Sequence, residues 1–190
     1  MISKSLPSTK EITSLLDESS DRDFSYPEVG ATRGEIPCHY NIDHNSEVIG
    51  RGGTDFAKAK QGIRDWAPFD LPWIRVFPES ELAVGVNVAV AGRIFGFWWI
   101  NLCRVVYTID EPDSFGFAYG TLPVHAESGE ELFKVERSPE TGDIRYEILA
   151  FSKPRHPLAR LGYPFSRATQ SRFRKGSIEA MARATSTFRR

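Results

Sequence analysis

The sequence predicts an α+β fold in which a curved antiparallel sheet of about seven strands surrounds one long C-terminal helix. Between Leu71 and Ser152, apolar residues recur with a period of two, in short runs separated by turn residues. This pattern is typical of a meander of antiparallel strands. After Pro154 the apolar spacing returns to three and four residues, which indicates a helix. The 190 residues fit one domain with its own core.

The N-terminal residues predict a short helix followed by an extended loop. Ser8 and Glu11 have the spacing of a capping box, in which each side chain satisfies an amide of the first helical turn. Pro27 disfavours helix at the residue before it, so the chain from Phe24 onward is expected to be extended. We therefore expect an N-terminal extension with a short helix over residues 1–23 and a single domain over residues 24–190.

A strand and a second helix are expected before the meander. Alternating residues from Tyr40 to His44 indicate a strand that ends near Gly50. Four apolar residues spaced three and four apart then share one face of a helix, which Pro68 ends. These four residues are Phe56, Ala59, Ile63 and Trp66.

Aromatic residues are concentrated in the predicted strands. They make up 12% of the chain, and eight of them fall in residues 95–119. Along Phe115–Gly120, aromatic residues alternate with glycine and alanine, so one strand face is aromatic and the other almost bare. The aromatic face can be plain core or the wall of an apolar pocket. A bare face lets another element or a ligand come close.

A cavity is expected because a curved sheet cannot close completely on a single helix. Arg104 lies in an otherwise apolar strand, so it pairs with a carboxylate, is exposed, or anchors a ligand carboxylate or phosphate. Asp110, Glu111 and Glu147 are the candidate carboxylate partners. The residues expected to bind a ligand are Trp98, Trp99, Arg104, Tyr107, Phe117, Tyr119 and Tyr146.

The net charge of −1 conceals a strong asymmetry. Residues 153–190 hold ten basic residues and one acidic residue, whereas residues 1–152 hold 14 basic and 24 acidic residues. The basic side chains can coat the solvent side of a C-terminal helix that packs on an acidic body. They can also attract nucleic acid or anionic lipid.

Several other classes of protein are not expected. No apolar run reaches the roughly 20 residues of a membrane span, and the polar start does not resemble a signal peptide. Cys38 and Cys103 form no disulfide framework, which favours reduced thiols in a cytoplasmic protein. The four histidines lack ligand spacing, so neither a metal nor a cofactor is expected. No motif identifies catalytic residues.

Five segments of the chain carry a family resemblance. They are Phe24–Thr32, Asn101–Tyr107, Phe115–Pro123, Ala150–Pro154 and Ala159–Pro164. Over about Phe24 to Met181, they resemble the nineteen-ninety family of domains of unknown function. Val124 departs from that family, because a glycine is expected before His125. The family has no established activity.

The resemblance implies a place near the START-like (SRPBCC, birch-pollen-allergen-like) superfamily, whose helix-grip architecture matches the element order. Its members typically hold lipids, sterols, polyketides or other hydrophobic molecules between the sheet and the long helix, and some are cyclases or hydrolases. We therefore expect a binder of a hydrophobic or amphipathic small molecule rather than an enzyme. One alternative is a cyclase- or hydratase-like enzyme that uses Tyr119, His125 or Glu147 as acid or base. The other, less favoured, is binding of nucleic acid or an anionic membrane through the basic helix.

Overall fold

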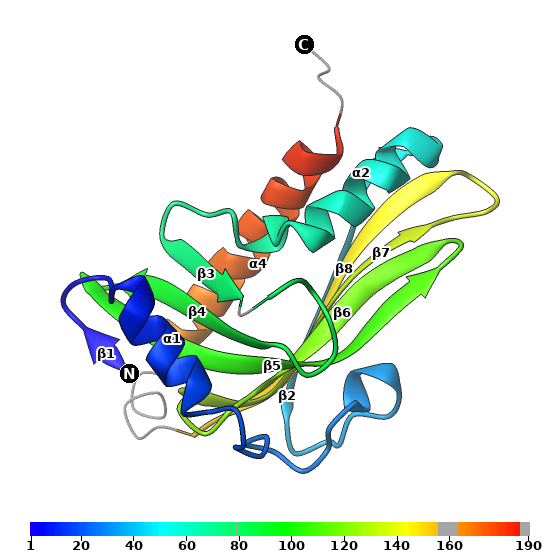
Figure 1. The fold of residues 1–190 in the computed structure, drawn as a ribbon. Helices are drawn as coiled ribbons and strands as arrows, with labels where there is room; N and C mark the ends of the chain where they lie inside the picture. Colours follow the sequence, from blue (N-terminus) through cyan, green and yellow to red (C-terminus); the bar gives the residue numbers. More distant parts are fainter. Residues whose placement is uncertain (79, 156–162, 187–190) are drawn as a thin grey trace.

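The computed structural model describes residues 1–78, 80–155 and 163–186 (Figure 1). The helical spacing expected at Leu158, Leu161 and Phe188, and most of Ala159–Pro164, lie outside these ranges. The elements are β1 (Ile2–Ser3), α1 (Thr9–Asp17), η1 (Ala31–Arg33), β2 (Asn41–Arg51), α2 (Gly52–Arg64), η2 (Ala67–Phe69), β3 (Ile74–Pro78), β4 (Asn87–Ile94), β5 (Phe97–Glu111), β6 (Ser114–Thr121), β7 (Glu127–Arg137), β8 (Asp143–Pro154) and α4 (Tyr163–Thr185).

The strands form one antiparallel sheet in the order β2-β8-β7-β6-β5-β4-β3, and the two-residue β1 pairs with β5. The sheet curves around α4, and α2 lies beside that helix on the same face (Figure 1). The predicted α+β fold, with a curved sheet around a long C-terminal helix, is confirmed.

Side chains divide between the two faces of the sheet because successive residues of a strand point in opposite directions. On the inner face, Phe117, Phe133 and Ile148 pack against Ile63 of α2 and Met181 of α4. On the outer face, the apolar residues of α1 pack on small and aliphatic residues of β4 and β5. The capping box of α1 is present: Ser8 Oγ accepts from the Glu11 amide at 3.3 Å, and the Glu11 carboxylate accepts from the Ser8 amide at 2.8 Å.

The bare outer face of β6 receives the extended N-terminal segment. A Cβ atom on Gly120 would lie 2.2 Å from Tyr26 Oη, so only glycine permits this approach. Tyr26 donates to the Glu130 carboxylate at 2.6 Å, and the amides of Gly30 and Thr32 donate to it at 2.7 and 3.1 Å. Glu130 is 2% exposed, so this buried carboxylate ties the N-terminal segment to β7.

The substitution Glu130→Gln is expected to lower the free energy of unfolding by about 2–3 kcal/mol, because an NH2 group replaces one of the two oxygens and cannot accept from the buried donors there. Urea denaturation followed by tryptophan fluorescence measures the change. Glu140→Gln, at an exposed turn, is the control and should change stability by less than about 0.5 kcal/mol. Equal stabilities of the two variants would contradict a role for Glu130 in holding the segment.

Candidate functional site

A cavity of about 350 Å³ lies between the inner face of the sheet and the N-terminal half of α4. At the other end of the inner face, aromatic rings pack closely: Phe117 and Phe133 stack at 5.3 Å, Trp66 lies 4.9 Å from Phe117, and all three are buried. The cavity is therefore the part of the concave face that the helices do not fill.

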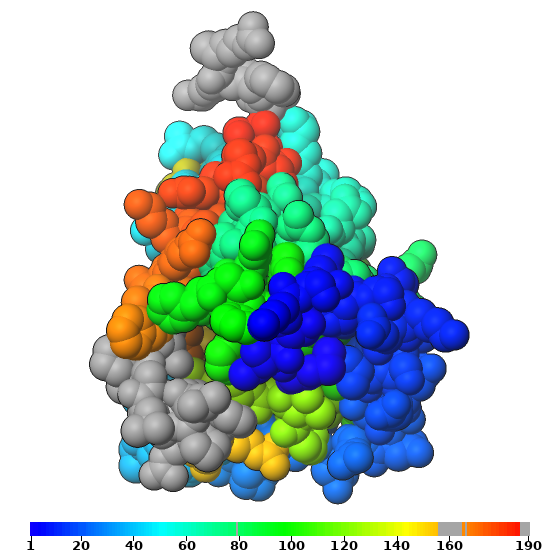
Figure 2. Space-filling model, turned by 90° about the vertical axis from the view of Figure 1, so that its left-hand side faces the viewer, coloured from blue at the N-terminus to red at the C-terminus, as the bar shows by residue number. Residues whose placement is uncertain are grey.

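One wall of the cavity is apolar and largely aromatic. Trp99 of β5 and Val90 of β4 form it together with Trp73, which precedes β3, and Phe69 and Phe173 complete it. At the rim, the rings of Phe95 and Phe165 lie 5.7 Å apart and are 75% and 63% exposed. Figure 2 shows this side of the molecule, where the start of α4 (orange) lies beside the β4–β5 hairpin (green).

Another wall of the cavity carries hydrogen-bonding groups from β6 and β7. Tyr119 Oη donates to the Glu131 carboxylate at 2.8 Å. Burial raises the pKa of Glu131 to about 7, although the hydrogen bond from Tyr119 and the positive charge of Arg174 oppose the rise. Burial and the nearby Glu131 carboxylate also raise the pKa of Tyr119 well above its ordinary value. This wall therefore places a carboxyl that titrates near neutral pH beside a neutral phenol.

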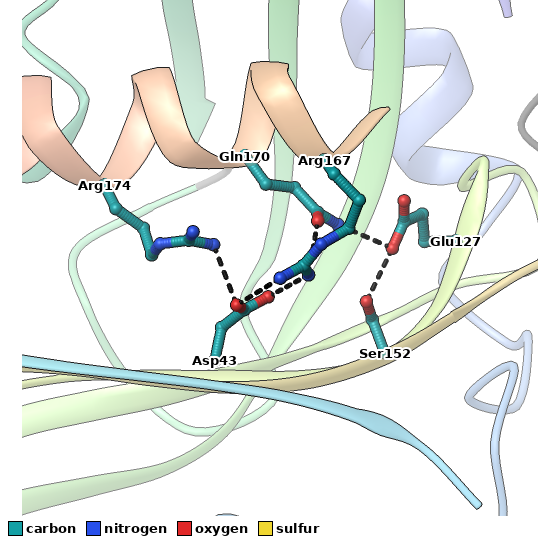
Figure 3. A network of polar contacts seen from close by, with 6 residues as sticks. All are labelled: Asp43, Glu127, Ser152, Arg167, Gln170 and Arg174. Carbon is teal, nitrogen blue, oxygen red and sulfur yellow. Dashed lines mark hydrogen bonds and ion pairs between the residues drawn. The ribbon is translucent and has the colours of Figure 1, made fainter. Parts of the chain in front are cut away.

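A second carboxylate, Glu127, joins this wall at the start of β7. Its Oε2 atom accepts hydrogen bonds from Ser152 of β8 at 2.6 Å and from Gln170 of α4 at 2.9 Å (Figure 3). Burial raises the pKa of Glu127 as well, because its hydrogen bonds only partly replace the lost water.

Asp43 of β2 connects the sheet to α4 (Figure 3). Both terminal nitrogens of Arg167 donate to its two carboxylate oxygens, and Arg174 lies 3.2 Å from Asp43 Oδ1. The side chains of Asp43 and Arg174 are only 13% and 15% exposed, so these ion pairs are substantially shielded from water.

His125, in the loop between β6 and β7, also lines the cavity. Its Nδ1 accepts the amide hydrogen of Glu127 at 3.0 Å, which leaves the ring proton on Nε2 in the neutral form. Burial lowers the pKa of His125 to about 4, so the ring is neutral at physiological pH and can donate from Nε2.

Of the seven residues expected to bind a ligand, Trp99 and Tyr119 line the cavity. Trp98 faces the opposite side of β5 and packs on the outer core with α1, because adjacent strand residues cannot share a face. Phe117 and Tyr146 point inward but are buried under the helices, where Tyr146 Oη lies 2.8 Å from Ser177 Oγ of α4.

Tyr107 and Arg104 lie on the outer face. A β-bulge after Val105 shifts the register of β5, so Tyr107 departs from the inward parity of the preceding residues and its hydroxyl meets Thr32 at 2.7 Å. The Arg104 guanidinium donates to Asn87 and to the carbonyls of three residues after α1. A carboxylate partner for Arg104 was therefore the wrong expectation. Those carbonyls belong to Ser19, Ser20 and Arg22.

Glu147, an acid–base candidate of the enzyme alternative, is remote from the cavity. It pairs with His44 at 2.8 Å and with Lys134 at 2.7 Å, so its carboxylate is already engaged elsewhere. The residues predicted from the sequence did not include the cavity carboxylates Glu127 and Glu131, although the strand pattern contains a signal for Glu131. Glu131 has the same strand parity as the inward-facing Phe133.

Across the described ranges, no three His, Cys, Asp or Glu side chains are gathered to hold a metal ion. No helix there has the length and apolar character needed to cross a membrane.

Comparisons with known proteins agree on family and fold. A UPF0548 protein of Dictyostelium discoideum is 32% identical over 200 residues, which cover 94% of this chain and 93% of the relative. A hypothetical protein of Helicobacter pylori has a similar structure, with a TM-score of 0.59 at 13% identity over 86% of this chain and 96% of the other. The major latex-like protein 151 of Panax ginseng gives a TM-score of 0.50 at 16% identity over 78% and 99%.

The structural likenesses confirm the helix-grip fold of the birch-pollen-allergen type. The model of the family described as "Domain of unknown function (DUF1990)" matches residues 25–180. The chain therefore belongs to the DUF1990 family, as the sequence segments indicated.

Proposed function

We propose that this protein binds an amphipathic small molecule in the cavity between the sheet and α4. The observation that carries the proposal is the division of the cavity into an aromatic wall and a hydrogen-bonding wall. Its volume of about 350 Å³ is within the range of small-molecule sites, which are about 300–1,000 Å³.

The two walls favour different parts of one ligand. Trp99, Trp73 and Phe173 offer apolar surface, on which each buried methylene group contributes about 0.8 kcal/mol. A wholly apolar ligand would displace water from Glu127 and Glu131 without replacing its hydrogen bonds, which is unfavourable. A ligand with an apolar body and a polar end avoids this loss.

The charges of α4 also favour a small molecule over nucleic acid. Arg167 and Arg174 bind Asp43 within the protein, and Arg172 lies over the Trp73 ring at 4.6 Å. Three cations of the basic C-terminal segment are thus engaged with the body of the protein, which supports the packing alternative for that segment.

Filling the cavity should weaken binding. Thr169 of α4 lines the cavity, so the substitution Thr169→Trp is expected to weaken binding of the apolar fluorophore N-phenyl-1-naphthylamine at least about tenfold. The measurement is a fluorescence titration, with circular dichroism to verify folding.

The matched control is Ala168→Trp, one residue earlier on α4, where the side chain is exposed. This variant should bind the fluorophore as the unmodified protein does. Saturable binding that survives Thr169→Trp would place the fluorophore elsewhere and contradict the proposal.

The second candidate is acid–base catalysis on the bound molecule. The hydrogen-bonded pair Tyr119–Glu131 lines the cavity, and general acids and bases work best when their pKa lies near the operating pH. Neutral His125 adds a donor on the same side. The arrangement suits proton transfer to or from a ligand that reaches Glu131.

The acid–base candidate requires the raised pKa of Glu131. Carboxyl ¹³C NMR is expected to give a titration midpoint of about 7 for this residue. Tyr119→Phe should move the midpoint higher, because the phenol stabilises the ionised carboxylate by donating to it. Tyr107→Phe, on the outer face, serves as the control and should leave the midpoint unchanged. A midpoint near that of an ordinary glutamate would remove the candidate.

A further inference from the structure

The charges that line the cavity are unequal. Four acidic residues line it, but the carboxylate of Glu130 binds the N-terminal segment on the outer face. The carboxylates of Asp43, Glu127 and Glu131 remain, and Arg174 is the one guanidinium among the described lining residues. Both oxygens of Asp43 are engaged by Arg167 and Arg174. One carboxylate compensates only one of the two guanidiniums, so Asp43, Arg167 and Arg174 together carry one positive charge. With both glutamates ionised, the group as a whole keeps one negative charge.

The two glutamates have neutral partners. Oε2 of Glu131 accepts from the Tyr119 hydroxyl, and Oε2 of Glu127 accepts from Ser152 and Gln170. Within the described ranges, no salt bridge reaches either carboxylate, and neither Oε1 atom accepts a hydrogen bond. Each glutamate therefore keeps one acceptor atom for a ligand.

The aromatic residues of the same cavity suit a cation too. The faces of aromatic rings carry negative electrostatic potential and attract cations, tryptophan most strongly. Trp99, Trp73, Phe69 and Phe173 present such rings around the same cavity. An ammonium group can donate up to three hydrogen bonds and accepts none, which matches a site where the unused atoms are acceptors.

We propose that the molecule bound in this cavity carries a protonated amine, which pairs with the unused oxygens of Glu131 and Glu127, and an apolar body that lies on the aromatic wall. This inference rests on the proposed function and names the chemical class of its ligand. An anionic amphiphile would face two glutamates and find the guanidinium of Arg174 already paired.

The pairing predicts a direction of pH dependence. Several charged or titratable groups surround Glu131. They are Tyr119 of β6, Cys103 of β5, Tyr146 of β8, Asp43 of β2 and Arg174 of α4, together with Glu127 and His125 in the same cavity. Burial keeps the tyrosines and the thiol neutral, and a pKa of about 4 keeps His125 neutral. Burial raises the pKa of Glu127, as it does that of Glu131, so any titration of Glu127 in this range has the same sign.

The test is isothermal titration calorimetry of the full chain with decylamine, decanol and decanoate at pH 6 and pH 8. Decylamine remains protonated at both, since alkylammonium groups resemble lysine, with a pKa of about 10.4. It should bind about tenfold more tightly at pH 8, where Glu131 is ionised, than at pH 6. Decanoate should show the opposite trend, and decanol almost none.

Glu131→Gln should remove the pH dependence of decylamine binding and weaken it about tenfold at pH 8. Glu140→Gln, at the exposed turn between β7 and β8, should preserve both. Glu127→Gln provides a second variant at the site, which should also weaken decylamine binding.

The outcomes separate this inference from the proposed function. If decanol and decanoate bind in competition with N-phenyl-1-naphthylamine but decylamine shows no rise in affinity with pH, the amine is the wrong ligand class and the cavity remains a binding site. If none of the three probes competes with the fluorophore, the inference is overturned. The proposed function is overturned as well if the fluorophore binds Thr169→Trp as it binds the unmodified protein.

Discussion

The cavity depends on the contact between Asp43 and the two arginines of α4. The C-terminal half of the helix packs on the inner core through apolar residues such as Ala180 and Met181. Its N-terminal half is instead held at β2 by the bidentate pair with Arg167 and the second pair with Arg174. Long guanidinium side chains can span a gap that a packed apolar contact would close. The C-terminal half of α4 therefore packs directly on the sheet, whereas ion pairs hold the N-terminal half at a distance that leaves the cavity.

The difference between the two halves of α4 explains why one end of the concave sheet surface stabilises the fold while the other end forms a cavity. At the filled end, aromatic rings stack beneath α2 and supply the apolar burial that stabilises the fold. At the open end, Glu127 and Glu131 are buried without a salt bridge among the described residues, an arrangement that disfavours their ionised forms. Proteins tend to break the rules of a well-packed core at functional sites. The unfavourable burial of these carboxylates is consistent with selection for a ligand rather than for stability.

Local patterns made the architecture predictable, whereas the site required long-range information. The change of period after Pro154 and the spacing of Ser8 and Glu11 identified the helices, because these signals lie within a few residues of one another. The alternation of residues along β6 placed Tyr119 on the inner face, as observed. The bulge after Val105 moves Tyr107 to the outer face, and a bulge cannot be read from the alternation of apolar residues.

The polar wall was harder to foresee for the same physical reason. Asp43 and Arg167 are 124 residues apart in sequence, and only the closure of β2 against β8 brings them together. Glu131 could have been placed by its parity with Phe133, but its partners come from β6 and α4. The partners of Arg104 were equally hard to foresee, because all but Asn87 are backbone carbonyls, which no residue pattern reveals.

The most direct test of the central claim, that the open end is maintained for a ligand, is a crystal structure of the protein purified from its own host. The account predicts continuous electron density of a small molecule between the sheet and α4, with its apolar part on Trp99 and Phe173 and a polar group within hydrogen-bonding distance of Glu131 Oε1. A cavity closed by its own side chains, with α4 packed directly on the sheet, would contradict the account.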